Sequence, residues 1–131
     1  MKRSPMKRSP FTKKAQETLR KKKHRKAWTL MSLYVRKRDR GICVTCGKPG
    51  NQAGHFIHGK LDFDFQNINC QCSGCNCWKH GNIVNYAIYL QERYDYGIIA
   101  ELRLRSNIVH KYEVDELDAI INNLEYLLGE K

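Results

Sequence analysis

Two Cys-x-x-Cys pairs, Cys43 with Cys46 and Cys72 with Cys75, constrain the fold of this chain more than any other feature. Cysteine thiolates are soft, negatively charged ligands, and two such pairs are able to hold one Zn²⁺ in a tetrahedral site. That site would close the 25 residues between the pairs into a loop. We expect the 131 residues to form one domain with tails, in which a structural zinc ion reinforces a small core.

The six cysteines are interpreted as metal ligands and core residues rather than as disulfides. The basic N-terminus lacks the apolar segment of a secretory signal, and no apolar run is long enough to span a membrane. We therefore expect a cytoplasmic protein, in a compartment where thiols stay reduced. Because a C-x-x-C turn brings two thiolates to one ion more readily than C-x-C, the neighbouring Cys70 and Cys77 are expected to be small core residues, and Trp78 is expected to join them.

Positive charge is concentrated in the N-terminal part of the chain. Residues 1–40 carry 16 lysines and arginines against two acidic residues, a net charge of +14, whereas residues 41–131 carry a net charge of −3. Such a polycation favours nucleic acid, because each neutralised phosphate releases a counterion. A solvated tail that only confers solubility is the alternative, and an anionic membrane surface is less favoured. The expected phosphate contacts are Arg20, Lys21, Lys22, Lys23, Arg25 and Lys26.

Hydrophobic spacing and turn residues predict a mixture of helices and short strands. The proline-containing repeat at residues 1–10 is expected to be disordered. Helices are expected at about 13–39, from Cys75 or Asn76 to 94, at 98–107 and at 114–128, with a short strand at 52–57 and a turn or strand at 62–65. The last helix is expected to pack on the core, with a coiled-coil dimer as the alternative. This divides the chain into a basic arm (1–26), a zinc-braced core (27–95) and a C-terminal helical region (96–131).

Histidines and amides in and after the zinc loop suggest the hydrolysis of a phosphodiester. That reaction needs a base to deprotonate water and a divalent cation to neutralise charge on the phosphate. His55 suits the first role because the pKa of histidine is near neutral. Asn76 and His80 would share one face of a helix that begins near Cys75, and together they could bind the cation. The alternatives are a hydrogen-bonded structural His55 and an exposed, inert His80.

Several short motifs around the cysteines add a family resemblance. They are Cys-x-x-Cys-Gly-Lys at 43–48, Ala-Gly-His-Phe at 53–56, Asn67, Gln-Cys-x-x-Cys-Asn at 71–76, and Gly81-Asn82 with Tyr86. This set resembles the HNH (ββα-metal) endonucleases and, more closely, the phage NinG (Rap) recombination endonuclease family. The resemblance covers roughly residues 28–95. It implies an α+β fold: a small zinc-stapled ββα-metal core with flanking helices and a disordered basic N-terminal arm.

The resemblance also implies roles for individual residues. By position, His55 corresponds to the general base, Asn67 to the asparagine that holds the histidine-bearing loop, and Asn76 to a ligand of a catalytic Mg²⁺ or Mn²⁺. Many relatives carry Asp or His before the base, where this chain has Gly54, so another ligand must replace it. His58 and His80 are candidates on spacing alone, although His58 is also expected to be a surface or DNA-facing residue.

Two functions of different classes follow. The resemblance implies a metal-dependent endonuclease that cuts branched DNA, such as Holliday junctions or D-loops, during phage recombination in the host cytoplasm. Junction resolution usually needs two cuts, which is compatible with a homodimer. The alternative is a non-catalytic zinc-finger protein that binds nucleic acid and in which His55 only packs. A regulatory protein that contacts a recombinase is a third, less favoured option.

Overall fold

The structure is a computed structural model that describes residues 12–129. The elements in chain order are α1 (Lys13–Arg38), β1 (Gln52–His55), β2 (Ile68–Gln71), the π-helical turn η1 (Gly74–Trp78), α2 (Ile83–Arg93), α3 (Ile98–Ser106) and α4 (Val114–Leu127). Helices and a small two-stranded sheet confirm the expected mixture of α and β structure. The N-terminal repeat, for which disorder is expected, lies outside the described residues.

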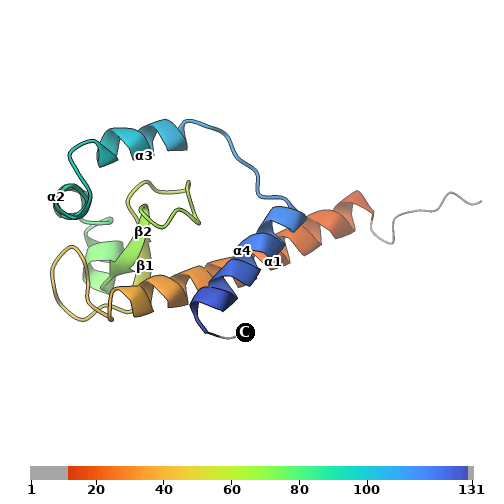
Figure 1. Cartoon of the computed structure of the whole chain (residues 1–131), viewed down its shortest axis with the longest axis horizontal. Helices are drawn as coiled ribbons and strands as arrows, with labels where there is room; N and C mark the ends of the chain where they lie inside the picture. Colours follow the sequence, from red (N-terminus) through yellow and green to blue (C-terminus); the bar gives the residue numbers. More distant parts are fainter. Residues whose placement is uncertain (1–11, 130–131) are drawn as a thin grey trace, which may run out of the picture.

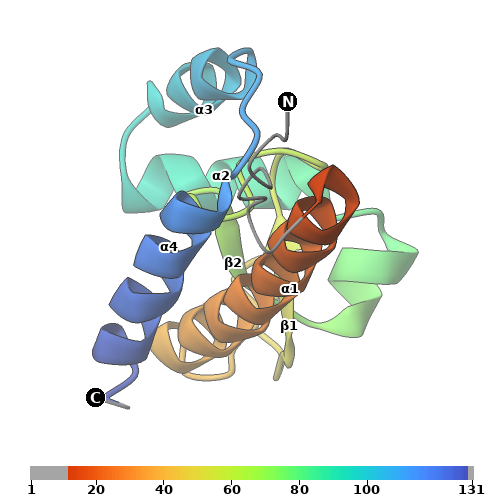
Figure 2. The same ribbon diagram turned by 90° about the vertical axis from the view of Figure 1, so that its right-hand side faces the viewer.

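The β-hairpin lies between two groups of helices. α4 runs alongside α1 on one side of the molecule, and α2 and α3 lie on the other side (Figures 1 and 2). One hydrophobic cluster joins α1, β2 and α4 through Met31, Val35, Ile68 and Leu124. A second cluster joins the segment after β1 to α2 and α3 through Phe56, Tyr86, Leu90, Ile98 and Leu102. The hairpin is therefore covered on both faces.

Helix α1 is one continuous helix that carries both the basic strip and part of the core. Thr12 caps its N-terminus, where the hydroxyl oxygen accepts a hydrogen bond from the Ala15 N–H at 3.1 Å. Ala27, Met31 and Val35 recur every fourth residue and are fully buried, as the apolar spacing predicts. The helix passes position 26 without interruption, so the second half of the basic arm is rigidly joined to the core.

The two strands pair antiparallel, with Gly54 opposite Asn69 and His55 opposite Ile68. β1 is the predicted strand, shortened to 52–55, and residues 62–65, expected to be a turn or a strand, form turns. All four residues of β2 are buried, although its sequence, Ile-Asn-Cys-Gln, alternates apolar and polar residues as a half-exposed strand would. Its two faces still differ: Ile68 packs against α1, whereas Asn69 and Gln71 turn buried amides toward the opposite side.

A buried polar network ties α1 to the hairpin and to α2. The Arg38 guanidinium donates hydrogen bonds to both carboxylate oxygens of Asp39 and to the side-chain oxygen of Asn69. The Asn69 amide donates to the Tyr86 hydroxyl, which donates to the Gly54 carbonyl at 2.8 Å. Burial raises the pKa of Tyr86, so its hydroxyl stays protonated and serves as a donor. Asn69, for which the sequence suggested no role, is a central member of this network.

The predicted helix from about Cys75 to Tyr94 is wrong in one respect, because it is divided in two. His80, Gly81 and Asn82 have φ values of 50°, 93° and 50°, and this left-handed backbone ends the turn η1 before α2 begins. Asn76 and His80 therefore do not share a face of one continuous helix.

Burial of the residues around η1 also differs in part from expectation. Cys70 is fully buried, as predicted. Cys77 is exposed and Trp78 is 83% exposed, so their assignment to the core is wrong. Both lie on η1 just after Cys75, and spacing alone does not reveal which residues of this turn face solvent. No helix among residues 12–129 is long and apolar enough to cross a membrane.

The packing of α4 on α1 leads to a stability prediction. Leu124 is 1% exposed between the two helices, whereas Leu127, one turn later, is 43% exposed. We expect Leu124→Ala to lower the free energy of unfolding by about 2–5 kcal/mol through lost burial and a cavity. The matched Leu127→Ala change should cost less than about 1 kcal/mol. Urea unfolding of zinc-loaded protein, followed by circular dichroism, measures both, and equal losses would contradict the packing described here.

Candidate functional site

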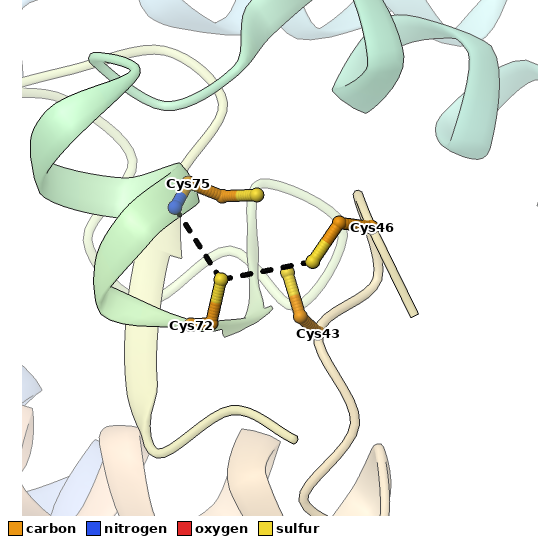
Figure 3. Close-up of side chains that lie close together, drawn as sticks. All are labelled: Cys43, Cys46, Cys72 and Cys75. Atoms are coloured by element: carbon orange, nitrogen blue, oxygen red, sulfur yellow. Dashed lines mark hydrogen bonds between the residues drawn. The ribbon is translucent and has the colours of Figure 1, made fainter. Parts of the chain in front are cut away.

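The four cysteines of the two pairs meet at one point in space. Their sulfur atoms all lie within 4.8 Å of one another, and the sulfurs of Cys46 and Cys72 are 3.7 Å apart (Figure 3). Zinc–sulfur bonds of about 2.3 Å in a tetrahedron place sulfurs about 3.8 Å apart. Among residues 12–129, this is the one group of three or more His, Cys, Asp or Glu side chains arranged to share an ion. The cluster could therefore hold a zinc ion.

Two different local structures present these thiolates. Cys43 and Cys46 lie on a turn after α1, where Gly47 has a φ of 79° and donates its N–H to the Cys43 carbonyl. Cys72 and Cys75 lie at the start of η1, and the Cys75 N–H points to the sulfur of Cys72 at 3.4 Å. Burial raises the pKa of Cys75, but hydrogen bonds from Thr45, Asn82 and the neighbouring sulfurs outweigh burial and lower it.

The thiols of the cluster do not share one pKa: the Lys48 backbone N–H lowers the pKa of Cys46, but burial and the neighbouring cysteine sulfurs outweigh it and raise this pKa to about 12. Burial raises the pKa of Cys43, but hydrogen bonds from Thr45 and neighbouring backbone groups outweigh burial and lower it to about 6. Burial and the nearby Asp39 carboxylate raise the pKa of Cys70 to about 11. Cys70 is therefore a neutral core thiol at neutral pH, as expected for a cysteine that is not a ligand.

His55, at the end of β1, is held by contacts on two sides. Its Nε2 lies 2.8 Å from an oxygen of Asp62, and its ring stacks on Trp28 of α1 with a centroid distance of 5.0 Å and an interplanar angle of 20°. The side chain is 19% exposed. These contacts restrict the orientation of the imidazole without covering it completely.

Asp62 also contacts a second histidine, His24 of α1. The His24 Nε2 lies 3.0 Å from the other Asp62 oxygen. The hydrogen bond from His55 lowers the pKa of Asp62, so this carboxylate is ionised at neutral pH and only accepts hydrogen bonds. The Nε2 atom of His55 must then carry the proton, and in the neutral ring Nδ1 is left as the basic nitrogen.

A surface groove runs beside this histidine pair. It has a volume of about 520 Å³ and is lined by His24, Arg25, Trp28, Thr29, His55 and Asp62. The groove therefore brings the candidate base, its carboxylate partner and a cation of the basic strip to one place. Neither His24, Trp28 nor Asp62 was among the predicted site residues. Asp62 alone had a local signal, as an acidic residue in the loop just after His55.

Asn67 forms hydrogen bonds with the backbone of the loop that follows His55. It is fully buried, and its side-chain oxygen accepts a hydrogen bond from the Ile57 N–H at 2.8 Å. Its amide nitrogen lies within hydrogen-bond distance of the carbonyls of Ile57 and Lys60. The side chain thus bridges the two sides of the loop that leads to Asp62.

The residues considered for a second cation lie on and after η1. Asn76 is half-buried on η1, and its amide nitrogen donates to the Gln52 side chain of β1 at 2.9 Å. His80 is exposed on the turn between η1 and α2. His58 is exposed on the loop after β1, and its ring lies 6.5 Å from that of His55.

The six basic residues considered for phosphate contact divide into two groups. Arg20 forms an ion pair with Glu17 at 2.6 Å, and Lys23 forms one with Asp118 of α4 at 2.5 Å. The other four are exposed along α1: Lys21, Lys22, Arg25 and Lys26. The helix therefore presents an exposed basic strip that continues to the edge of the histidine groove at Arg25.

Comparison with known proteins agrees with the family suggested by the motifs. The sequence profile of the family described as Bacteriophage Lambda NinG protein matches residues 2–129. Over 104 residues the chain is 33% identical to Protein ninG of Escherichia phage 933W, 32% to that of Salmonella phage P22 and 31% to that of Escherichia phage lambda. These matches cover 73% of this chain and 50–51% of the relatives, so the chain spans about half their length. No solved structure matches.

The cysteine geometry generates a metal-binding prediction with a matched control. Cys46 and Cys77 are both exposed, but only Cys46 belongs to the four-sulfur cluster. We expect the parent protein and Cys77→Ser to retain about one zinc ion per chain, and Cys46→Ser to lose it during dialysis against a chelator. Metal analysis by atomic emission measures the stoichiometry. Equal zinc loss from the two variants would show that the cluster is not the zinc site.

Proposed function

Because the chain belongs to the bacteriophage NinG family, we propose that it is a divalent-metal-dependent DNA endonuclease that acts on branched recombination intermediates, such as Holliday junctions or D-loops. The observation that carries this proposal is the imidazole of His55, which is held by Asp62 beside a groove on a basic helix. The proposed place of action is the cytoplasm of the phage host.

The hydrogen bonds of His55 support a role as general base. With Nε2 donating to Asp62, the Nδ1 atom is free to take a proton from a water molecule. The water oxygen forms a new bond to phosphorus, and the bond from phosphorus to the leaving strand breaks. Asp62 stabilises the imidazolium that results, as a carboxylate does when it orients a catalytic histidine. Trp28 limits rotation of the ring by stacking on it.

The metal sites have separate tasks in this proposal. The tetrathiolate holds the start of η1 to the turn after α1, and so supports both ends of the hairpin that carries His55. A four-sulfur site leaves no open position for water, which suits a structural role. A Mg²⁺ or Mn²⁺ near Asn76 would supply charge neutralisation at the phosphate.

A non-catalytic zinc protein that binds nucleic acid is the competing function. The observation that favours it is Gly54, which offers no side chain to a cation next to His55. In that case the zinc cluster and α1 suffice for binding, and the histidine–aspartate pair only stabilises the loop after β1. The two functions differ in whether DNA is cut when divalent metal is added.

Replacement of His55 tests catalysis directly. We expect zinc-loaded parent protein with Mg²⁺ or Mn²⁺ to cut a labelled four-way junction, and His55→Ala to cut about 10²–10⁴-fold more slowly because the general base is removed. The Asp62→Asn variant should cut the junction at least about tenfold more slowly than the parent, because a neutral amide no longer stabilises the imidazolium. Gel analysis of cut strands measures the rates, and gel shift in EDTA should show retained binding.

The matched control is His110→Ala, since His110 is exposed and pairs with Glu116 away from the groove. It should cut like the parent. Cleavage by His55→Ala at the parental rate would refute the assignment of His55. No cleavage by the parent on linear, flapped or four-way DNA with either metal would favour the non-catalytic alternative.

The exposed basic strip predicts the salt dependence of DNA binding. Replacing Lys21, Lys22, Arg25 and Lys26 with glutamine should lower the slope of log affinity against log salt by about 0.9 for each lost phosphate contact, or up to about 3.6 in all. A matched variant neutralises four exposed residues elsewhere, Lys37, Arg40, Lys48 and Arg103, and should keep the parental slope. Fluorescence anisotropy over a salt series measures both. Identical slopes for the two variants would reject the strip as the phosphate-binding surface.

A further inference from the structure

The side chain of Gln71, at the end of β2, is fully buried and leaves one polar atom unsatisfied. Its amide nitrogen donates to the Gly81 carbonyl at 2.9 Å and approaches the Thr45 hydroxyl at 3.3 Å. These two acceptors fix which end of the amide is oxygen. That oxygen, Oε1, is buried and has no hydrogen-bond partner among the described residues. A buried acceptor without a donor is unfavourable, so a bound group with positive charge or a donor is expected there.

Oε1 occupies the space left by the absent side chain of Gly54. A Cβ atom at Gly54 would lie 1.8 Å from Gln71 Oε1 and 3.0 Å from the side-chain oxygen of Asn76. The Asn76 nitrogen donates to the Gln52 side chain at 2.9 Å, which directs Asn76 Oδ1 toward Gly54. Two amide oxygens therefore converge near Gly54, one from β2 and one from η1.

We propose that Gln71 Oε1 and Asn76 Oδ1 together bind a hard divalent cation, Mg²⁺ or Mn²⁺, whose other ligands are water. Hard cations prefer oxygen ligands such as side-chain amide carbonyls and keep several waters, whereas the thiolates nearby suit zinc. Gln71 then supplies from the opposite strand the ligand that Gly54 is unable to supply. This deepens the proposed endonuclease function, on which it rests, and it makes Gln71, rather than His80 or His58, the partner of Asn76.

The proposed cation site lies close in the chain to His55, the proposed general base of the endonuclease. Gly54 and His55 are adjacent in β1, and side chains of adjacent strand residues point to opposite faces. The paired oxygens lie on the face toward η1, and the imidazole lies on the face toward α1. A phosphate bound along the edge of β1 would be next to both.

Binding of Mn²⁺ to the zinc-loaded full-length chain tests the site without any need for cleavage. We expect a site whose occupation removes the electron paramagnetic resonance signal of free Mn²⁺. Asn76→Asp should tighten this site about tenfold or more, because it replaces a neutral ligand with a charged one. The half-buried Gln52 amide is able to turn and donate to the new carboxylate. The control Asn123→Asp, on the exposed face of α4, should leave the affinity unchanged.

Gly54→Ala tests the same site by filling it. The added methyl group must displace the Gln71 oxygen, so Mn²⁺ should bind at least about tenfold more weakly while the zinc ion stays bound. Gly97→Ala is the matched control, because Gly97 is exposed and has an ordinary backbone conformation with a φ of −77°. A gain of affinity in Asn76→Asp with a loss in Gly54→Ala supports the site, and misfolding does not produce the gain.

The outcomes separate this inference from the proposed function. Absence of Mn²⁺ binding to the parent, or binding that neither Asn76→Asp nor Gly54→Ala alters, would overturn the site and leave water as the group that satisfies Gln71. Metal-dependent DNA cleavage together with that result would leave the endonuclease function standing. Mn²⁺ binding that responds to both variants, in a protein that cuts none of the DNA substrates, would support the cation site and reject the endonuclease function.

Discussion

The close approach of four cysteine sulfurs is the constraint on which the other local structures depend. Four thiolates within 4.8 Å of one another would repel each other, and a cation between them would remove that repulsion, so the cluster could hold a metal ion. One pair precedes β1 and the other follows β2, and their meeting closes the whole hairpin segment into a loop. A small domain gains much from such a closure, because the hairpin alone buries too little apolar surface to be stable.

Within that loop, three buried side-chain amides at alternate positions determine which groups contact the hairpin. Asn67, Asn69 and Gln71 are all fully buried. Asn67 holds the loop after His55, Asn69 joins the network of Arg38 and Tyr86, and Gln71 reaches across to Gly81 and Gly54. Each buried amide must be hydrogen-bonded or satisfied by a ligand, so this face of the hairpin specifies its neighbours more strictly than an apolar face would.

The histidine groove depends on contacts between distant parts of the chain. His24 and Trp28 come from the same helix that presents the exposed basic strip, and both contact the loop or strand that carries Asp62 and His55. The basic helix is therefore part of the wall of the groove. In the proposed endonuclease, a DNA strand bound along α1 would be guided toward His55 by this shared helix.

Local chemistry was sufficient to predict the four cysteines that cluster, helix α1, the amphipathic α4 and the buried Cys70, because metal-ligand spacing and apolar periodicity are properties of neighbouring residues. It was not sufficient for β2, a strand of four residues that contains Asn69, a residue type depleted in strands, or for the left-handed turn at His80 to Asn82 that divides the predicted helix. The cysteine pairs, basic strip and His55 were thus determined by the sequence alone. Only the tertiary structure decided that Asp62 holds His55 and that Gln71 occupies the space left by Gly54, because both contacts form between side chains that packing alone brings together.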